Sequence, residues 1–185
     1  MSSPRILVVD DEAEIRNLLR DILRDENYAV ELASNAAQAR AARAAAEHDL
    51  PELLNLYRHL HPHDPQLETA IAERVWSKLL RSGFTTVIVA QAAELLVSSC
   101  TLAIVPNLSR GGRSYGVIEN VVTHADYRRL GLGRRVLAHA LDVAWQADCY
   151  KVLLATGSKQ ETTLRSYEEA GFHRGGKTYF ELRRP

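Results

Sequence analysis

The stretch from Val121 to Val136 constrains the fold more than any other part of this 185-residue chain. An apolar strand end leads into a turn with two arginines, then a Gly-x-Gly, and then directly into a helix. The helix is indicated by apolar residues at helical spacing, namely Val136, Leu137, Ala140, Leu141 and Ala144. A strand that turns directly into a helix leaves unpaired backbone N–H groups where the helix dipole is positive. The sequence therefore predicts a strand–turn–helix unit with a place for an anion.

The glycines and arginines of this turn indicate what kind of anion fits. Gly131 and Gly133 lack the side chains that would keep a ligand away from the backbone. Positive charge around the helix start comes from Arg128, Arg129, Arg134 and Arg135. Phosphate groups bind at helix starts of this kind. A Gly-x-Gly alone fits an ordinary turn with solvated arginines equally well. Other motifs in the sequence are needed to distinguish a phosphate-binding turn from an ordinary one.

The spacing Arg128-x-x-Gly131-x-Gly133 after a strand resembles the pyrophosphate loop of the GNAT superfamily of acetyl-CoA-dependent N-acetyltransferases. Residues 118–122 resemble the central splayed strand of that fold, and residues 151–156 resemble its next strand. Residues 166–172 resemble its late helix, with the ending Tyr-Glu-x-x-Gly-Phe. The resemblance covers about residues 41–185, and its motifs follow one another in the family's order.

This resemblance implies a fold, a co-substrate and the residues that hold it. The fold is α/β, with a mixed, mostly antiparallel central sheet flanked by helices, and the co-substrate is acetyl-CoA. In the family the central strand carries a bulge, beside which the pantetheine arm binds like an added strand. The expected cofactor-binding residues are Val121, Val122, Thr123, Arg128, Arg129, Leu130, Gly131, Leu132, Gly133, Arg134 and Ser158. Ser158 stands where many relatives have an asparagine, and its hydroxyl can still donate a hydrogen bond.

Acetyl transfer to an amine also needs a proton acceptor for the amine and a proton donor for the departing thiolate. By resemblance, Tyr167 matches the tyrosine that protonates the thiolate, and a buried core tyrosine is the alternative. Glu119 is the candidate general base because it lies two residues before Val121, hence on the same strand face. A surface carboxylate is the alternative there. The expected reaction is acetyl transfer to a primary amine by direct attack in a ternary complex.

The first forty residues follow a different pattern. Residues 5–12 form an apolar strand that ends in acids, and residues 28–33 alternate like a second strand. Between them lies a helical stripe of Ile15, Leu18, Leu19, Ile22 and Leu23. This βαβ opening resembles the receiver domain of two-component response regulators, in which Asp10 and Asp11 would help to hold a magnesium ion. Simple capping of the helix is the alternative. We expect a receiver-like segment over residues 1–40 and an acetyltransferase domain over residues 41–185.

The receiver resemblance ends before the phospho-accepting aspartate. If residues 49–54 are the third receiver strand, Asn55 takes the aspartate's place and phosphotransfer has no nucleophile. The same stretch also matches the first helix of the acetyltransferase fold, which aligns its leucines on one face. We therefore expect residues 1–35 to carry no phosphorylation switch and to pack as an accessory layer or as extra strands. The alanine-rich stretch from Ala36 to Glu47 favours a helix, although the family has a strand there.

The remaining chain alternates helix-like and strand-like segments. A helix is expected over residues 67–80, a pair of hairpin strands over residues 85–90 and 95–105, and a further strand over residues 114–123. A final strand is expected over residues 177–182. Interleaved strands and helices predict a mixed α/β sheet.

Composition narrows the partners of the chain. The totals of basic and acidic residues are equal at 23, but residues 1–49 carry 6 basic and 10 acidic side chains, so the later part is cationic. We expect a cytoplasmic protein that binds a small-molecule amine or an exposed amino group, with no nucleic-acid or membrane partner. A homodimer remains possible.

Cys100 and Cys149 are expected to be buried thiols, and we expect the histidines of residues 59–63 to hold no metal. A response-regulator-type signalling module and a non-catalytic acyl-CoA-binding protein are the alternative functions.

Overall fold

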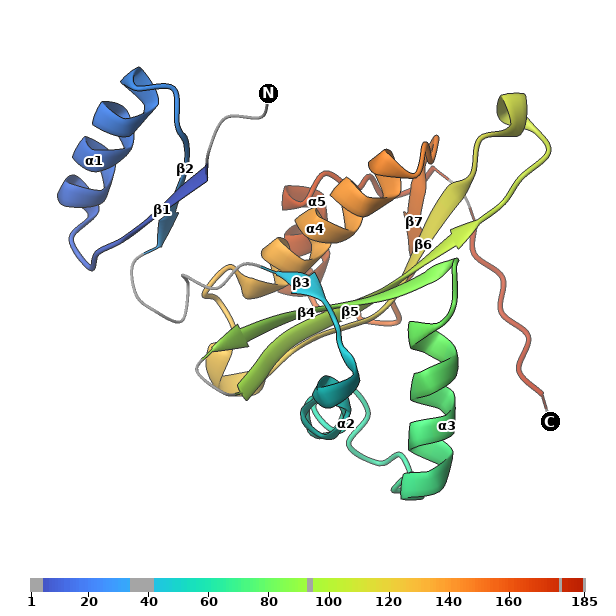
Figure 1. The fold of residues 1–185 in the computed structure, drawn as a ribbon. Coiled ribbons are helices and arrows are strands. Elements are labelled where there is room, and N and C mark those ends of the chain that lie inside the picture. The colour runs from blue at the N-terminus through green and yellow to red at the C-terminus, as the bar shows by residue number, and fades with distance from the viewer. Residues whose placement is uncertain (1–4, 34–41, 93–94, 177, 185) are drawn as a thin grey trace.

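A computed structural model describes residues 5–33, 42–92, 95–176 and 178–184. Its centre is a five-stranded main sheet with the strand order β3-β4-β5-β6-β7 (Figure 1). The strands are β3 (Arg43–Ala44), β4 (Thr85–Ala92), β5 (Leu95–Val105), β6 (Tyr115–Thr123) and β7 (Val152–Leu154). Neighbouring strands are antiparallel, except that β6 and β7 are parallel. The predicted α/β fold with a mixed, mostly antiparallel sheet is confirmed.

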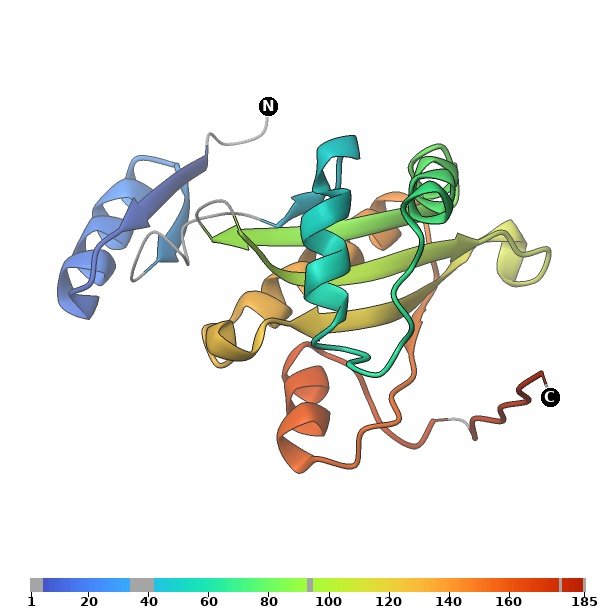
Figure 2. The same ribbon diagram turned by 90° about the horizontal axis from the view of Figure 1, so that it is seen from below.

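Helices cover both faces of the main sheet. The helices α2 (Leu50–Tyr57) and α3 (Thr69–Leu80) lie on one face, and α4 (Leu132–Gln146) lies on the other (Figures 1 and 2). The core on the α4 side contains Ile88, Cys100, Leu102, Ile118 and Val136, each almost fully buried. The core on the α2 side contains Leu53, Leu56, Trp76, Val87 and Val89. The alternation of side chains along β4 therefore sends consecutive residues to opposite cores.

The edge strand β3 takes the place of the helix that the alanine-rich sequence predicts. Arg43 and Ala44 pair antiparallel with β4. The Arg43 guanidinium donates to both carboxylate oxygens of the buried Asp49, at 2.6 and 2.8 Å, and this hydrogen bonding lowers the pKa of Asp49. The sequence left residues 36–47 open between a helix and a strand, and Arg43 and Ala44 form a strand because pairing with β4 outweighs the helix propensity of alanine. Residues 36–41 of that prediction lie outside the described residues.

The alternative third receiver strand does not form. Glu47–Asp49 is a single 3₁₀ turn (η1), and α2 follows it directly with Pro51 in its first turn. Proline is tolerated at that position because the first N–H groups of a helix have no partner within it. The helical interpretation of this stretch is therefore correct.

A separate unit precedes the main sheet, and we call it the N-terminal βαβ unit. It consists of β1 (Arg5–Val9), α1 (Ala13–Asp25) and β2 (Ala29–Ala33), and β1 and β2 pair in parallel in a two-stranded sheet of their own. The three elements have their main contacts with one another. Of the two arrangements expected for them, an accessory layer or extra strands of the main sheet, the second is wrong, because β1 and β2 pair with each other in a sheet of their own.

The C-terminal strand that the sequence predicts is absent over residues 178–182, which pair with no strand in the described part of the chain. Lys177 lies outside the described residues. Cys100 and Cys149 are free thiols and both are buried. Within the described ranges, no helix is both long and apolar enough to cross a membrane.

Candidate active site

A β-bulge interrupts β6 at Asn120 and Val121. The pairing with β5 passes from Thr101–Glu119 to Ser99–Val122, so one residue of β5 faces two residues of β6. Asn120 has a positive φ of 53°, which asparagine tolerates better than most residues. Only residues 116–118 of β6 pair with β7, so along the described chain the part of β6 after the bulge has no strand partner on that side. The bulge that the family resemblance implies is therefore present, beside a gap in the sheet.

The turn between β6 and α4 is shaped by its glycines. Gly131 is the N-cap residue of α4 and has a φ of 77°, in the left-handed region that favours glycine. A Cβ atom on Gly133 would lie 3.2 Å from Thr123 Oγ1, so the helix start packs closely against the strand end. No side chain caps α4. The first N–H groups of the helix are therefore left for a ligand.

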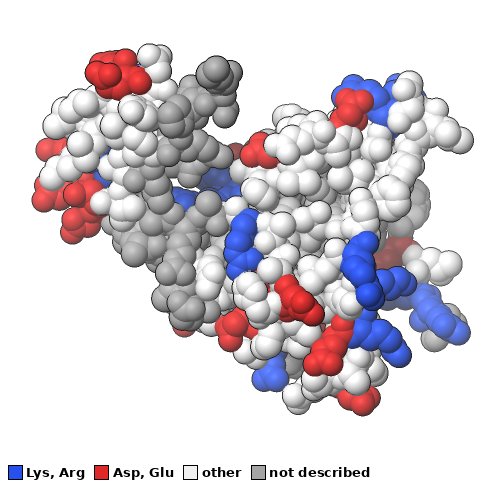
Figure 3. Space-filling model, viewed as in Figure 1, with Lys and Arg blue, Asp and Glu red and all other residues white. Residues whose placement is uncertain are grey.

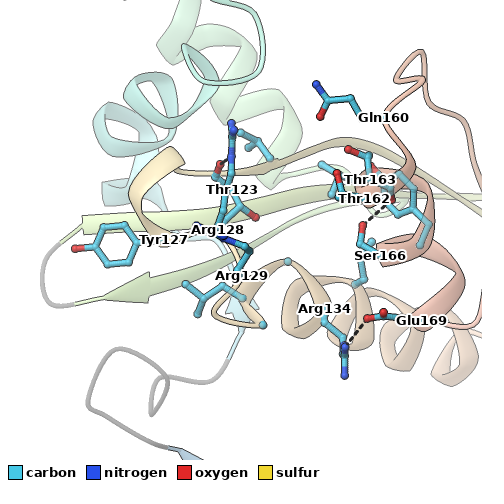
Figure 4. A pocket seen from close by; sticks show the side chains of 17 residues that line it. Thr123, Tyr127, Arg128, Arg129, Arg134, Gln160, Thr162, Thr163, Ser166 and Glu169 are labelled. Carbon is cyan, nitrogen blue, oxygen red and sulfur yellow. Dashed lines mark hydrogen bonds and ion pairs between the residues drawn. The ribbon is translucent and has the colours of Figure 1, made fainter.

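A cavity of about 730 Å³ lies between the second half of β6, the start of α4 and the helix α5 (Glu161–Glu169) (Figure 4). Most residues that the sequence predicts as a site line it together: Val121, Val122, Thr123, Arg128, Arg129, Gly131, Leu132, Gly133, Arg134 and Tyr167. The fold thus brings the bulged strand, the glycine turn and the late helix to one hollow.

Sequence reasoning did not assign the other residues of the cavity wall, several of which belong to α5. The lining residues that it did not single out are Tyr127, Leu137, Gln160, Thr162, Thr163, Ser166 and Glu169. Thr163 lies four residues before Tyr167 and hence on the same side of α5, so helical spacing from Tyr167 could have found it.

Two expected cofactor contacts lie away from the cavity. Leu130 packs against the core on the α4 side and does not line the cavity. The Ser158 hydroxyl accepts the Gln160 N–H at 3.3 Å, just before the start of α5. Ser158 therefore shapes the loop in front of α5, and its predicted contact with the cofactor is not brought to the cavity.

Three arginines, Arg128, Arg129 and Arg134, lie near the start of α4. Arg134 forms an ion pair with Glu169 of α5, with 2.7 Å between Nη2 and Oε2, so it joins two walls of the cavity (Figure 4). Arg128 donates from Nε to the Thr123 carbonyl at 3.3 Å. Arg128 and Arg129 are both exposed at the rim. Their charges add to the positive end of the helix dipole.

Tyr167 is the partly buried phenol of the cavity. Its ring packs against the core on the α4 side. Burial raises the pKa of Tyr167, while a hydrogen bond with the Thr156 side chain acts in the opposite direction. The tyrosine therefore holds its proton at neutral pH, as a proton donor must.

Glu119 lies on the opposite face of β6 from Val121. Glu119 pairs with Thr101, which in turn pairs with the α2-side residue Val87, whereas Val121 packs against the core on the α4 side. The inference that Glu119 and Val121 share a face is wrong, because the extra residue of the bulge reverses the alternation. Glu119 is exposed on the α2 face, separated from the cavity by the thickness of the strand.

Two histidines that are distant in sequence meet beside the cavity. The ring centroids of His59 and His124 are 4.1 Å apart, and the ring of Tyr127, which lines the cavity, lies edge-on to His124. Burial lowers the pKa of His59, and the nearby His124 and Arg128 act in the same direction. In the part of the chain that the structure describes, no three His, Cys, Asp or Glu residues are placed to hold a metal ion.

Comparisons with known proteins agree with this arrangement. The sequence model of the Acetyltransferase (GNAT) family matches residues 50–172. A glucosamine 6-phosphate N-acetyltransferase of Trypanosoma brucei brucei is 34% identical over 131 residues, which cover 70% of this chain and 86% of that protein. The structure of a putative acetyltransferase from Agrobacterium tumefaciens is 44% identical, covers 78% of this chain and 99% of that one, and superposes with a TM-score of 0.74.

A shorter match is to a transcriptional regulatory protein. The transcriptional regulatory protein ResD of Bacillus subtilis is 54% identical over 46 residues, which are 25% of this chain and 19% of that protein. This match agrees with a receiver-like segment and is too short to carry an activity.

The fold and the matches define the class of the protein. The chain belongs to the GNAT family of acetyltransferases. It is an acetyl-CoA-dependent acyltransferase.

Proposed function

We propose that the protein transfers the acetyl group of acetyl-CoA to a primary amine by direct attack in a ternary complex. The observation that carries this proposal is the cavity that joins the bulge of β6, the start of α4 and Tyr167. A thioester in this cavity would meet backbone donors and a phenol, while the opposite face of the bulge remains for the amine. This arrangement provides for both substrates at once.

The pyrophosphate of the cofactor binds at the start of α4 in this proposal. The N–H groups after Gly131 and the positive end of the helix dipole favour a phosphate there. Arg128 and Arg129 add charge at the rim. The pantetheine arm then runs beside Val121 and Val122, where β6 lacks a strand neighbour, and binds like an added strand.

Tyr167 acts as the general acid. The amine nitrogen attacks the thioester carbonyl carbon, the C–S bond breaks, and the thiolate of coenzyme A takes a proton from the Tyr167 hydroxyl. Its raised pKa keeps this proton available at neutral pH. The proton that the amine loses leaves by way of Glu119, and the tyrosine regains a proton from solvent.

Glu119 accepts the amine's proton from the α2 face. Because the bulge separates Glu119 from Val121, this transfer runs through the gap that the bulge opens, by way of a water molecule. The acceptor amine therefore approaches from the side of α2, opposite the cofactor.

A covalent acetyl-cysteine intermediate has little chemical support. Cys100 is fully buried, and burial raises the pKa of its thiol to about 12. A thiol in this state is a poor nucleophile because the thiolate is the reactive form. Direct attack by the amine therefore fits the site better than a two-step transfer.

The acceptor to be tested first is glucosamine 6-phosphate. The relative from Trypanosoma brucei brucei carries the name of this activity and is 34% identical. Simple primary amines and peptides with an exposed amino group belong in the same panel, because acceptor pockets are built largely from loops that vary between relatives.

The experiment measures release of coenzyme A thiol while both substrates are varied. Intersecting initial-velocity lines are expected for a ternary complex, and parallel lines would replace it by a covalent intermediate. Acetyl-CoA binding without thiol release for any amine would favour a non-catalytic acyl-CoA-binding protein. In the Glu119→Gln variant we expect kcat/KM to fall at neutral pH and to recover at high pH, where the amine deprotonates unaided. A pH-independent defect would contradict the role of base.

We also propose that the domain boundary lies near residue 40. β1, α1 and β2 form their own sheet, and the first strand of the main sheet begins at Arg43. Residues 1–40 are then a receiver-like segment and residues 41–185 the acetyltransferase domain. The segment has no acceptor aspartate for phosphotransfer, so it carries no phosphorelay activity.

A further inference from the structure

An ion pair crosses the cavity between α4 and α5. Arg134 is the third residue of α4, Glu169 is the last residue of α5, and both line the cavity. Arg134 Nη2 lies 2.7 Å from Glu169 Oε2 (Figure 4), and in the described part of the chain no other ion pair joins these two helices. The two side chains are 63% and 60% exposed, so a ligand in the cavity can reach the pair.

Each charge of this pair lies at the end of its own helix that disfavours it. A helix start carries partial positive charge and favours anions, whereas a helix end favours cations. Arg134 is a cation at a helix start that has no acidic residue in its first turn. Glu169 is an anion at a helix end that has no basic residue in its last turn. In this structure Glu169 therefore supplies the anion that the start of α4 attracts.

The other two arginines that line the cavity have no such partner. Arg128 donates to the Thr123 carbonyl, and among the described residues neither Arg128 nor Arg129 forms an ion pair. Their charges are available to a phosphate directly. A phosphate that contacts Arg134 has to displace the Glu169 carboxylate first, so this contact forms against a competitor.

We propose that Glu169 weakens the hold on coenzyme A, because its carboxylate competes with a phosphate of the cofactor for Arg134. This inference rests on the proposed function, in which the pyrophosphate binds at the start of α4. Acetyl-CoA and coenzyme A carry the same phosphates, so the competition acts on substrate and product alike. When coenzyme A leaves, Glu169 returns to Arg134 and offsets part of the lost contact. Glu169 thus promotes product release; it touches no reacting atom and acts through Arg134.

The attachment of α5 does not depend on this ion pair. Tyr167 packs against the core on the α4 side. Arg174 lies after the helix and holds Glu161 and Glu168, with nitrogen–oxygen distances of 3.0 and 2.6 Å. An exposed ion pair adds little to stability. Glu169→Gln keeps the shape of the side chain and removes its charge, so we expect it to leave the fold intact.

The first test measures coenzyme A binding by calorimetry for the unchanged chain, Glu169→Gln and Glu168→Gln at low salt. Glu169→Gln is expected to bind about two- to fivefold more tightly, which is the range that an exposed ion pair supplies. The gain should shrink in about 0.5 M KCl, because salt screens exposed charges. Glu168→Gln is the matched control, because Glu168 is the neighbouring carboxylate but pairs with Arg174 and does not line the cavity. It should bind coenzyme A like the unchanged chain.

Unchanged or weaker binding by Glu169→Gln would overturn the inference, and so would an equal gain in Glu168→Gln or a gain that persists undiminished in high salt. These outcomes leave the proposed function in place, because the unchanged chain still binds the cofactor. If the unchanged chain binds no coenzyme A, the proposed function fails and this inference fails with it.

A second test asks whether Glu169 acts through Arg134. Arg134→Gln is expected to weaken coenzyme A binding, and adding Glu169→Gln to it should give a smaller gain than in the unchanged background. An equal gain in both backgrounds would show that Glu169 repels the phosphates by itself, and the competition for Arg134 would be wrong. Inhibition of acetyl transfer by the product coenzyme A should strengthen in Glu169→Gln by the same factor as binding. Unaltered inhibition would contradict a role in release.

Discussion

The protein contains two βαβ units that have the same local arrangement but differ in how far their helices are buried. The N-terminal βαβ unit pairs β1 and β2 in parallel around α1, and the unit β6–α4–β7 pairs its strands in parallel around α4. The residues that α4 buries are Leu132, Val136, Leu137, Ala140 and Ala144. In α1 none of the residues is buried, and Leu18 and Ile22 are 61% and 51% exposed. An amphipathic sequence is thus enough to form a helix beside a strand pair, but burial of its apolar face requires a wider sheet.

The starts of the two helices differ in a way that separates their functions. At α1 the Asp10 side chain accepts the Glu12 N–H at 2.8 Å, so an acidic side chain already lies at the helix start. At α4 the N-cap is Gly131 and no side chain caps the helix. Acidic side chains gather over the N-terminal unit, and basic ones gather toward the C-terminal side of the molecule (Figure 3). The uncapped start of α4 is therefore more favourable for an anion than the start of α1.

The largest expected effect comes from removing a hydroxyl beside the second unit. Tyr167→Phe keeps the packed ring but removes the proton for the thiolate, so kcat should fall by roughly 10²–10⁴-fold with little change in acetyl-CoA affinity. Tyr28→Phe, in the N-terminal unit, is the matched control and should keep the wild-type kcat. Because burial raises the pKa of Tyr167, the acid remains protonated past an ordinary tyrosine pKa of about 10, and activity should persist to that pH. A wild-type kcat in Tyr167→Phe, with chemistry shown to limit turnover, would remove the acid role.

The second effect concerns stability and compares one leucine from each helix. Leu137 of α4 is 3% exposed, so Leu137→Ala should lower the free energy of unfolding by about 2–5 kcal/mol. Leu18 of α1 is 61% exposed, so Leu18→Ala should change it by less than about 0.5 kcal/mol. Urea unfolding followed by circular dichroism measures both, because α1 and α4 each contribute to the helical signal. Equal losses for the two variants would show that α1 is buried against the rest of the molecule after all.

The last prediction is that a phosphodonor has no effect on the rate of acetyl transfer. Treatment of the full chain with acetyl phosphate or beryllofluoride should leave the rate of acetyl transfer unchanged, because the N-terminal unit has no acceptor aspartate. Asp10→Asn and Asp11→Asn should behave like the wild type under the same treatment. A rate change that both substitutions abolish would give the N-terminal unit a signalling role.

The sequence was sufficient to predict those parts of the site whose residues follow a local pattern within one turn or one helix. The turn at Gly131 and Gly133 and the face of α4 follow from local chemistry and helical spacing, and the structure places them as predicted. Glu119 was misplaced because a one-residue bulge reverses the strand alternation, and no local residue pattern announces that reversal. β3 could not be decided from the sequence, because alanine favours a helix and only pairing with β4 makes the strand. Both cases share one physical cause, since pairing between distant segments outweighs local propensity.

The central claim is that the start of α4 holds the pyrophosphate of acetyl-CoA, and calorimetry of Gly133→Val tests it most directly. The added side chain would begin 3.2 Å from Thr123 Oγ1, so it crowds the strand end and occupies space at the helix start where the phosphates are to bind. Gly83→Val is the matched control, because no atom lies within 4 Å of a Cβ added there. With the fold verified by circular dichroism, the account predicts that Gly133→Val loses at least about tenfold in acetyl-CoA affinity, or about 1.4 kcal/mol, and that Gly83→Val loses none. Unchanged affinity in a folded Gly133→Val protein would contradict the claim.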